Sequence, residues 1–211
     1  METNQSSAEE LKTIRKMMEE STKFLSLSGL SGLFPGLFAI AGAVVVWFMV
    51  LDSGNISYAE ASESIAGKSL TEIKIQLVIV AMSVLLLSLA SAFYFSYRNA
   101  KQTGRSMFTP VARRLLVSLL IPLAAGGLLA IILLVQNQIQ LIIPVFLIFY
   151  GLSLVNAGKF TYNEIFYLGI LEIITGLISS VFPAQGLLFW VVGFGILHIV
   201  YGIMMYRKYE V

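Results

Sequence analysis

Charged residues are absent from four long stretches of this chain, and this pattern restricts the fold more than any other feature. Residues 24–51, 75–97 and 115–158 contain 28, 23 and 44 residues, respectively, without Asp, Glu, Lys or Arg. The fourth stretch, 165–206, contains one such residue, Glu172. A transmembrane α-helix needs about 20 apolar residues to cross a hydrocarbon core of ~30 Å. The first two stretches therefore predict one membrane-spanning helix each, and the last two predict two each.

Short segments with turn-forming residues divide the two longest stretches. Residues 136–140 read Gln-Asn-Gln-Ile-Gln, and residues 182–186 read Phe-Pro-Ala-Gln-Gly, which are both typical of turns. We therefore expect an all-α membrane protein, with a bundle of six transmembrane helices in one domain over residues 24–211. The expected helices cover residues 26–51, 73–97, 113–135, 140–158, 163–181 and 187–206.

The composition supports a membrane protein and argues against other classes. Only 12% of the residues are charged and 57% are hydrophobic, whereas soluble domains contain about 25% charged residues. A net charge of +2 gives no reason to expect nucleic acid as a partner. The expected partner is the lipid bilayer. The absence of cysteine excludes disulfides and thiolate metal sites.

The distribution of Lys and Arg predicts the orientation, because cytoplasmic loops are enriched in both. With six helices, the two ends and the loops near 98–114 and 158–162 lie on one side and contain twelve Lys and Arg residues, against two in the outer loops. We therefore expect both termini in the cytoplasm and the protein in the cytoplasmic (inner) membrane of a bacterium.

The polar N-terminal segment, residues 1–23, has the pattern of an amphipathic helix. Ser7 and Glu10 have capping-box spacing, and an apolar residue recurs at helical spacing at Leu11, Ile14 and Met18. This pattern predicts a helix lying on the inner membrane surface. The alternative is a docking helix for a cytoplasmic partner.

Two polar residues fall inside the expected spans and form the candidate site. Glu172 lies nine residues from Asn163, and His198, the single histidine, lies nine residues from Arg207. At 1.5 Å per residue, both lie about 14 Å from the same end of adjacent antiparallel helices. A charged residue at this depth costs roughly 2.5–3.5 kcal/mol even on the mildest scale. The pair is a proton-responsive or substrate-contacting site, or a structural hydrogen bond between neighbouring helices, or it contains a Glu172 that burial keeps protonated.

Small residues recur every four positions in the first expected helix, at Ser28, Gly32 and Gly36. Small residues allow two helix backbones to approach closely. This stripe predicts a helix-packing surface, which serves either packing within the subunit or a dimer interface.

An internal repeat is visible at an offset of 44 residues. Gly151, Gly158 and Tyr162 correspond to Gly195, Gly202 and Tyr206. This offset equals the length of one helical hairpin and predicts three tandem helical hairpins. The alternative is coincidence between apolar segments rich in glycine and tyrosine.

Five residues over one helical hairpin carry a family resemblance: Gly169, Gly176, Pro183, Gly195 and Gly202. This pattern resembles the HdeD-type acid-resistance proteins, which are six-span bacterial membrane proteins. The segment 24–32 is also similar to small uncharacterised bacterial membrane proteins. The first resemblance implies a stress-related role, and neither implies catalytic residues.

The sequence lacks the motifs of most enzymes. It contains no glycine-rich phosphate loop, no nucleophile-elbow serine, and too few histidines for a histidine-based metal site. We therefore expect no catalytic activity and no cofactor. The favoured function is a structural, stress-response or partner-binding membrane protein, whose partner is another membrane protein or a second copy of the chain. The alternative is a small transporter or channel that uses Glu172 and His198.

Overall fold

The computed structural model describes residues 24, 27–51, 70–104 and 106–210. Within these residues the fold is entirely helical, and six helices are long and apolar enough to cross a membrane. The predicted number of helices with the length and apolarity of a membrane span is thereby confirmed. The predicted N-terminal amphipathic helix, residues 1–23, lies outside the described residues. The first five spans comprise α2 (Leu30–Val46) with a π-helical turn (Trp47–Leu51), α3 (Leu70–Gln102), α4 (Pro110–Val135), α5 (Ile142–Ala157) and α6 (Asn163–Val181).

The sixth span consists of three successive helical segments. These are α7 (Gly186–Trp190), the π-helix η6 (Val191–Leu197) and α8 (His198–Tyr209). The turn before this span is the 3₁₀ segment Pro183–Gln185, which begins with proline as its first residue. Proline suits this position because the first helical residue needs no backbone N–H donor.

Local capping explains where α4 begins and ends. Thr109 has an extended backbone, and its side chain accepts a hydrogen bond from the Ala112 N–H, as an N-cap residue does. The helix ends before Asn137, whose φ of 64° places it in the left-handed region that asparagine tolerates. The ammonium group of Lys74 donates to the Leu134 carbonyl at 2.9 Å and to the Asn137 side chain. A cation at a helix C-terminus is stabilising because it faces the negative end of the helix dipole.

Helix α3 is longer than the sequence analysis predicted. It was expected over residues 73–97, but it extends over 33 residues from Leu70 to Gln102. At 1.5 Å per residue this helix is about 50 Å long, well beyond a ~30 Å hydrocarbon core. The difference arises because backbone hydrogen bonding continues through charged residues at both ends, whereas hydropathy measures only the apolar part.

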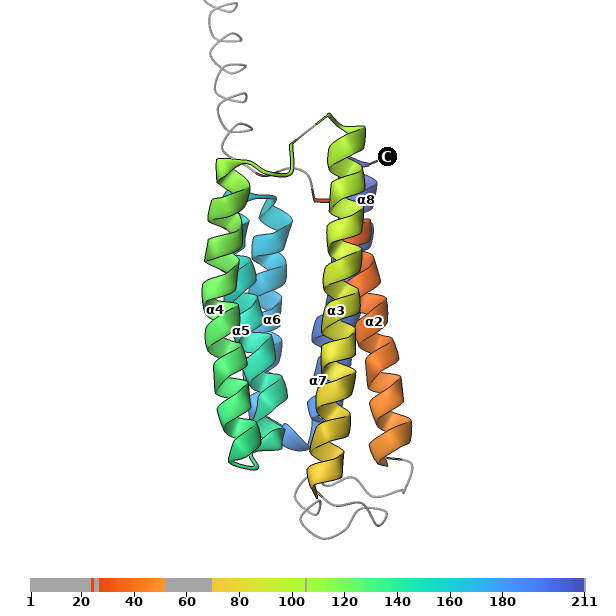
Figure 1. Ribbon diagram of the computed structural model, residues 1–211, viewed down its shortest axis with the longest axis vertical. Helices are drawn as coiled ribbons and strands as arrows, with labels where there is room; N and C mark the ends of the chain where they lie inside the picture. Colours follow the sequence, from red (N-terminus) through yellow and green to blue (C-terminus); the bar gives the residue numbers. More distant parts are fainter. Residues whose placement is uncertain (1–23, 25–26, 52–69, 105, 211) are drawn as a thin grey trace, which may run out of the picture.

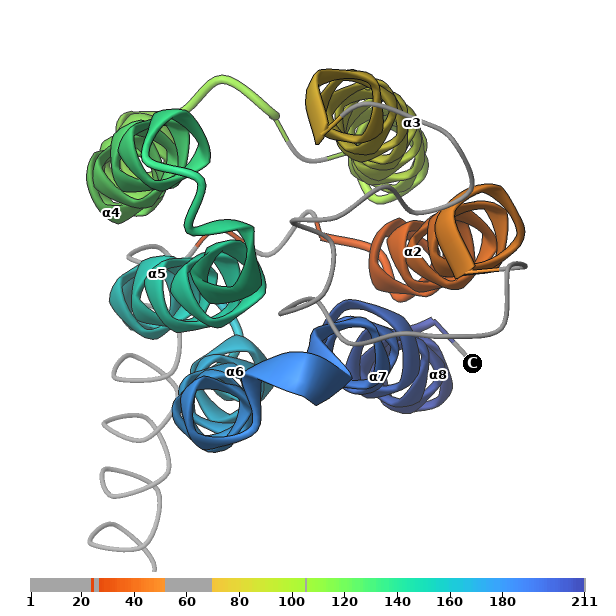
Figure 2. The same cartoon turned by 90° about the horizontal axis from the view of Figure 1, so that it is seen from below.

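The helices are arranged as an open curve when viewed along the bundle (Figure 2). Each helix packs against the next in the order α3, α2, α7–α8, α6, α5 and α4. The first and last spans along the chain are therefore neighbours, and α3 and α4 occupy the two ends of the curve. Both described ends of the chain lie at one end of the bundle (Figure 1), where the Phe24 N–H donates to the Phe160 carbonyl at 2.7 Å.

Glycines allow two pairs of helices to approach closely. An alanine Cβ built at Gly202 of α8 would lie 2.5 Å from the Leu33 nitrogen of α2 and 2.8 Å from the Gly29 carbonyl oxygen. In the α5–α6 pair, a Cβ at Gly169 would lie 2.7 Å from the Gly151 carbonyl oxygen. Backbone atoms form these contacts, so the close approach requires the missing side chain. Glycines also recur at seven-residue spacing in the four spans that contain these helices or directly at their ends: Gly29 and Gly36, Gly151 and Gly158, Gly169 and Gly176, Gly195 and Gly202.

Polar contacts join three helices at the end of the bundle that contains Glu210. The Glu210 carboxylate accepts hydrogen bonds from the Ser28 hydroxyl at 3.1 Å and from the Gly29 N–H, so it caps the N-terminus of α2 from another helix. Glu164, in the first turn of α6, accepts hydrogen bonds from Lys208 at 2.5 Å and Tyr209 at 3.1 Å. The C-terminus of α8 is thereby attached to the N-termini of both neighbouring helices.

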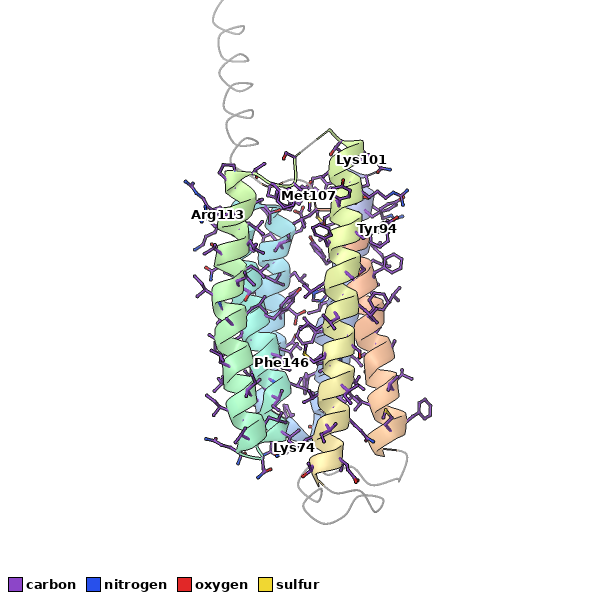
Figure 3. The ribbon with its side chains drawn as sticks, viewed as in Figure 1. Lys74, Tyr94, Lys101, Met107, Arg113 and Phe146 are labelled. Carbon is purple, nitrogen blue, oxygen red and sulfur yellow. The ribbon has the colours of Figure 1, made fainter. Side chains whose placement is uncertain are left out.

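The outward surface of the bundle is apolar. On α3 the exposed fraction is 59% for Ile79, 60% for Leu86 and 59% for Leu89. Contiguous apolar surface on this scale is rare on soluble monomers. Charged residues instead lie near the ends, with Lys101 and Arg113 at one end and Lys74 at the other (Figure 3). This distribution matches a molecule surrounded by lipid along its middle and by water at both ends.

Candidate functional site

The polar residues predicted from the sequence lie at the middle of their spans. Glu172 is the central residue of α6, nine residues from Asn163 and nine from Val181, which places it about 14 Å from either end of the helix. His198 is the first residue of α8 and follows the π-helix. Glu172 is fully buried, and His198 is 5% exposed.

The structure places the two side chains next to each other. The Nδ1 atom of His198 lies 3.3 Å from Oε1 of Glu172. The sequence analysis placed the two residues at equal depth on adjacent antiparallel helices, and the structure brings their side chains into contact.

Tyr150 of α5 is a third member of the site that the sequence analysis missed. Its hydroxyl oxygen lies 2.8 Å from Nε2 of His198, and the two rings are stacked with centroids 5.4 Å apart. The position of Tyr150 within its apolar segment could have identified it from the sequence. The span that contains it runs from Ile139 to Phe160, and Tyr150 is at its middle, where tyrosine is less expected than at the membrane interfaces.

The π-helix η6 supplies the fourth residue of the site, Gly193. The Nδ1 atom of His198 lies 3.2 Å from the carbonyl oxygen of Gly193, five residues earlier, which is the spacing of one π-helical turn. Gly193 also provides space for the carboxyl group, because a Cβ at this position would lie 2.7 Å from Oε2 of Glu172 and would also contact Leu147. Single π-helical turns within α-helices are frequent at functional sites.

Aromatic side chains surround the histidine ring. Trp190, Phe194 and His198 follow one another at four-residue spacing, with the Trp190 and Phe194 centroids 4.7 Å apart and those of Phe194 and His198 6.1 Å apart. The Trp190 indole N–H donates to the Ala39 carbonyl of α2 at 3.0 Å. These contacts fix the position of the segment that carries His198.

Glu172 lacks hydrogen bonds despite its burial. Among the described residues, neither carboxyl oxygen of Glu172 has a hydrogen-bond partner, and the same is true of the buried Ser179 hydroxyl. Buried polar groups are usually satisfied, so an exception calls for a physical explanation. The site that the structure defines, named the central cluster below, consists of Glu172, His198, Tyr150 and Gly193.

The small-residue stripe predicted on the first span faces other parts of the same chain. A Cβ at Gly32 would lie 2.7 Å from the Tyr201 ring, and one at Gly36 would lie 2.8 Å from the Gly195 carbonyl oxygen. Ser28 donates to Glu210. All three residues are buried by the C-terminal span, so the contacts agree with packing within the subunit, the first of the two alternatives.

No group of three or more metal-ligating side chains (His, Cys, Asp, Glu) lies together in the described part of the chain. The central cluster contains one carboxyl group and one imidazole, together with a phenol and a carbonyl. Chemically, such a set can bind or pass a proton, or can hold helices together by hydrogen bonds.

Comparison of the chain with protein-family models, curated proteins and solved structures finds no match. The resemblance to HdeD-type proteins therefore stays a prediction. Six helices have the length and apolarity that crossing a membrane requires, which is the pattern of a multi-pass membrane protein.

Proposed function

We propose that this chain is a six-span integral membrane protein with no catalytic activity and a structural, stress-response or partner-binding role. The observation that supports this function is the burial of the central cluster, with exposed fractions of 0% for Glu172 and 5% for His198. A catalytic residue must reach its substrate. Here the candidate residues contact one another and the helices around them, which favours a role in holding α5, α6 and α8 in one arrangement.

The proposed location is the cytoplasmic membrane of a bacterium, with both termini in the cytoplasm. Twelve of fourteen Lys and Arg residues support this orientation by the positive-inside rule. Lys101 and Arg113 lie together at one end of the bundle (Figure 3), the end at which the chain terminates (Figure 1), and this placement agrees with the proposed orientation. The proposed partners are the lipid bilayer and either another membrane protein or a second copy of the chain, with no role for nucleic acid.

Reporter fusions test the placement in the membrane. Fusions after Val211 and within residues 98–114 should give a cytoplasmic signal, and fusions within residues 54–68 and at Asn137 should give an external signal. A cytoplasmic signal from residues 54–68 would contradict the orientation.

A single observation favours the alternative of a small transporter or channel. Both carboxyl oxygens of Glu172 lack hydrogen-bond partners among the described residues, and an unsatisfied ionisable residue at mid-membrane is often part of an ion or proton pathway.

Purified protein in lipid vesicles separates the two functions. A pH-sensitive dye inside the vesicles reports proton entry when a potassium diffusion potential makes the interior negative. The proposed function predicts the same rate as for empty vesicles. Transport would give a faster rate, which Glu172→Gln would abolish. The matched control is Glu164→Gln, a glutamate on the same helix outside the central cluster.

A further inference from the structure

Two glutamates of α6 are buried, but their surroundings differ. Glu164 is 9% exposed, and Oε1 accepts hydrogen bonds from the Lys208 ammonium group and the Tyr209 hydroxyl. Glu172 is fully buried, and in the described part of the chain its one ion-pair contact within 4 Å is the His198 ring at 3.3 Å. The charge state of Glu172 therefore depends on whether His198 is an imidazolium cation or a neutral imidazole.

The hydrogen bonds of His198 indicate the neutral form. In the described part of the chain, the Tyr150 hydroxyl has one hydrogen-bond partner, His198 Nε2 at 2.8 Å. Tyr150 is partly buried, and at mid-membrane a hydroxyl that does not donate leaves an unsatisfied proton, which is unfavourable. Tyr150 therefore donates, Nε2 accepts, and the ring proton lies on Nδ1. That proton has an acceptor in the Gly193 carbonyl, at 3.2 Å, so every polar atom of the neutral ring is satisfied.

A neutral His198 leaves Glu172 without a cation. Among the described residues, the titratable groups that accompany it in the central cluster are His198 of α8, at 3.3 Å, and Tyr150 of α5, which contacts His198. Both are neutral in this arrangement. A carboxylate here would be a buried, uncompensated charge that accepts no hydrogen bond. Its cost exceeds that of a neutral carboxyl group with an unsatisfied hydroxyl.

From this geometry we infer that Glu172 is a proton-binding site that holds a proton in the folded protein, so that the central cluster carries no net charge. The ligand of the site is a proton, bound to a carboxyl oxygen beside the neutral Nδ1–H of His198. The proton on Glu172 is then part of the folded structure, since its loss would place a negative charge at the centre of the membrane. This inference rests on the membrane placement proposed above and holds for either proposed function.

Infrared spectroscopy tests this inference, because the carbonyl band of a protonated carboxyl group is separate from the bands of a carboxylate. The full chain is reconstituted in vesicles of phosphatidylcholine and phosphatidylglycerol at pH 7, and the spectrum of Glu172→Gln is subtracted from that of the wild type. We expect one protonated-carboxyl band per chain, shifted in D₂O. A carboxylate band in the difference spectrum would overturn the inference. The matched control is Glu164→Gln, whose difference spectrum should show a carboxylate because Glu164 is paired with Lys208.

A second measurement avoids dependence on the folding of Glu172→Gln. Wild-type protein with ¹³C-labelled glutamate should show the protonated-carboxyl band shifted from its unlabelled position, and its absence would overturn the inference. The variant His198→Gln separates the neutral form from an ion pair. We expect the band to be retained, as it is in the wild type. A band that is absent in the wild type and appears in His198→Gln would show that the imidazolium had kept Glu172 ionised. The reporter fusions test a different statement. A cytoplasmic signal from residues 54–68 would contradict the proposed orientation in the membrane, and the infrared result would still report the protonation of Glu172.

Discussion

Replacement of Gly202 by alanine should separate α8 from α2. The new Cβ would lie 2.5 Å from the Leu33 nitrogen, against 3.4 Å for ordinary contact, so the helices must move apart by about 0.9 Å. The atoms in the way belong to the backbone of α2 and cannot move aside as a side chain would. A gap of 0.5–1 Å loses roughly a quarter to a half of the dispersion attraction at each affected atom pair.

The steric cost of Gly202→Ala is measured as the difference in free energy of unfolding from a matched control, Gly127→Ala. Gly127 lies inside α4, and a Cβ at this position would meet no atom within 4 Å. Both substitutions gain the helix propensity of alanine, about 1 kcal/mol. The difference between the two variants therefore isolates the steric cost, which is about 1–3 kcal/mol for overpacking and is expected in the upper part of that range.

Unfolding by sodium dodecyl sulfate in mixed micelles, followed by far-ultraviolet circular dichroism, measures the free energies of unfolding. We expect Gly127→Ala to be as stable as the wild type or slightly more stable, and Gly202→Ala to be less stable than Gly127→Ala by about 2–3 kcal/mol. Equal stability of the two variants would refute the close approach of α2 and α8. A Gly29→Ala substitution on the facing helix should be non-additive with Gly202→Ala, because the same separation relieves both clashes.

Three further predictions concern polar contacts. Tyr150→Phe should lower the free energy of unfolding by about 1–3 kcal/mol, since it leaves the buried Nε2 of His198 without a donor; an unchanged value in the same micelle assay would contradict that hydrogen bond. Lys74→Met should lower it by about 0.3–1 kcal/mol, through loss of the cation at the C-terminus of α4; no change at low salt would exclude the capping role. A double-mutant cycle with Glu164→Gln and Lys208→Met should give a small coupling that decreases as salt is added, because Lys208 is 57% exposed; a large, salt-independent coupling would show a buried ion pair instead.

The spans could be predicted from the sequence because membrane insertion depends on local composition. Charge-free stretches gave all six, and the turns at 136–140 and 182–186 divided the two longest ones correctly. The order of the helices around the bundle could not be predicted. An apolar residue suits a helix neighbour and a lipid chain equally well, so hydropathy does not distinguish the inner face of a helix from its outer face. The seven-residue glycine spacing marks the packed faces, but it does not identify which helix packs against which.

The central cluster was only partly predictable for a related reason. Glu172 and His198 stand out because ionisable residues are rare at mid-membrane. Tyr150 is apolar over most of its surface and resembles the aromatic residues around it. The π-helix, which brings the Gly193 carbonyl to His198, has no signal in local composition, because it differs from an α-helix only in the hydrogen-bonding pattern of the backbone.

The neighbouring positions of α2 and α8 have a consequence for synthesis of the protein. Helices α4, α5 and α6 can pack against one another as soon as each enters the membrane, because they are consecutive in the chain. The glycine face of α2 must wait for the last span to leave the ribosome. During that interval this face, with Gly29, Gly32 and Gly36, is available to other helices, including those of chaperones and insertion factors. A ribosome stalled after Val181 would hold α2 without α8, and site-specific cross-linking from Gly32 in such a stalled chain would identify which helix occupies the face until α8 arrives.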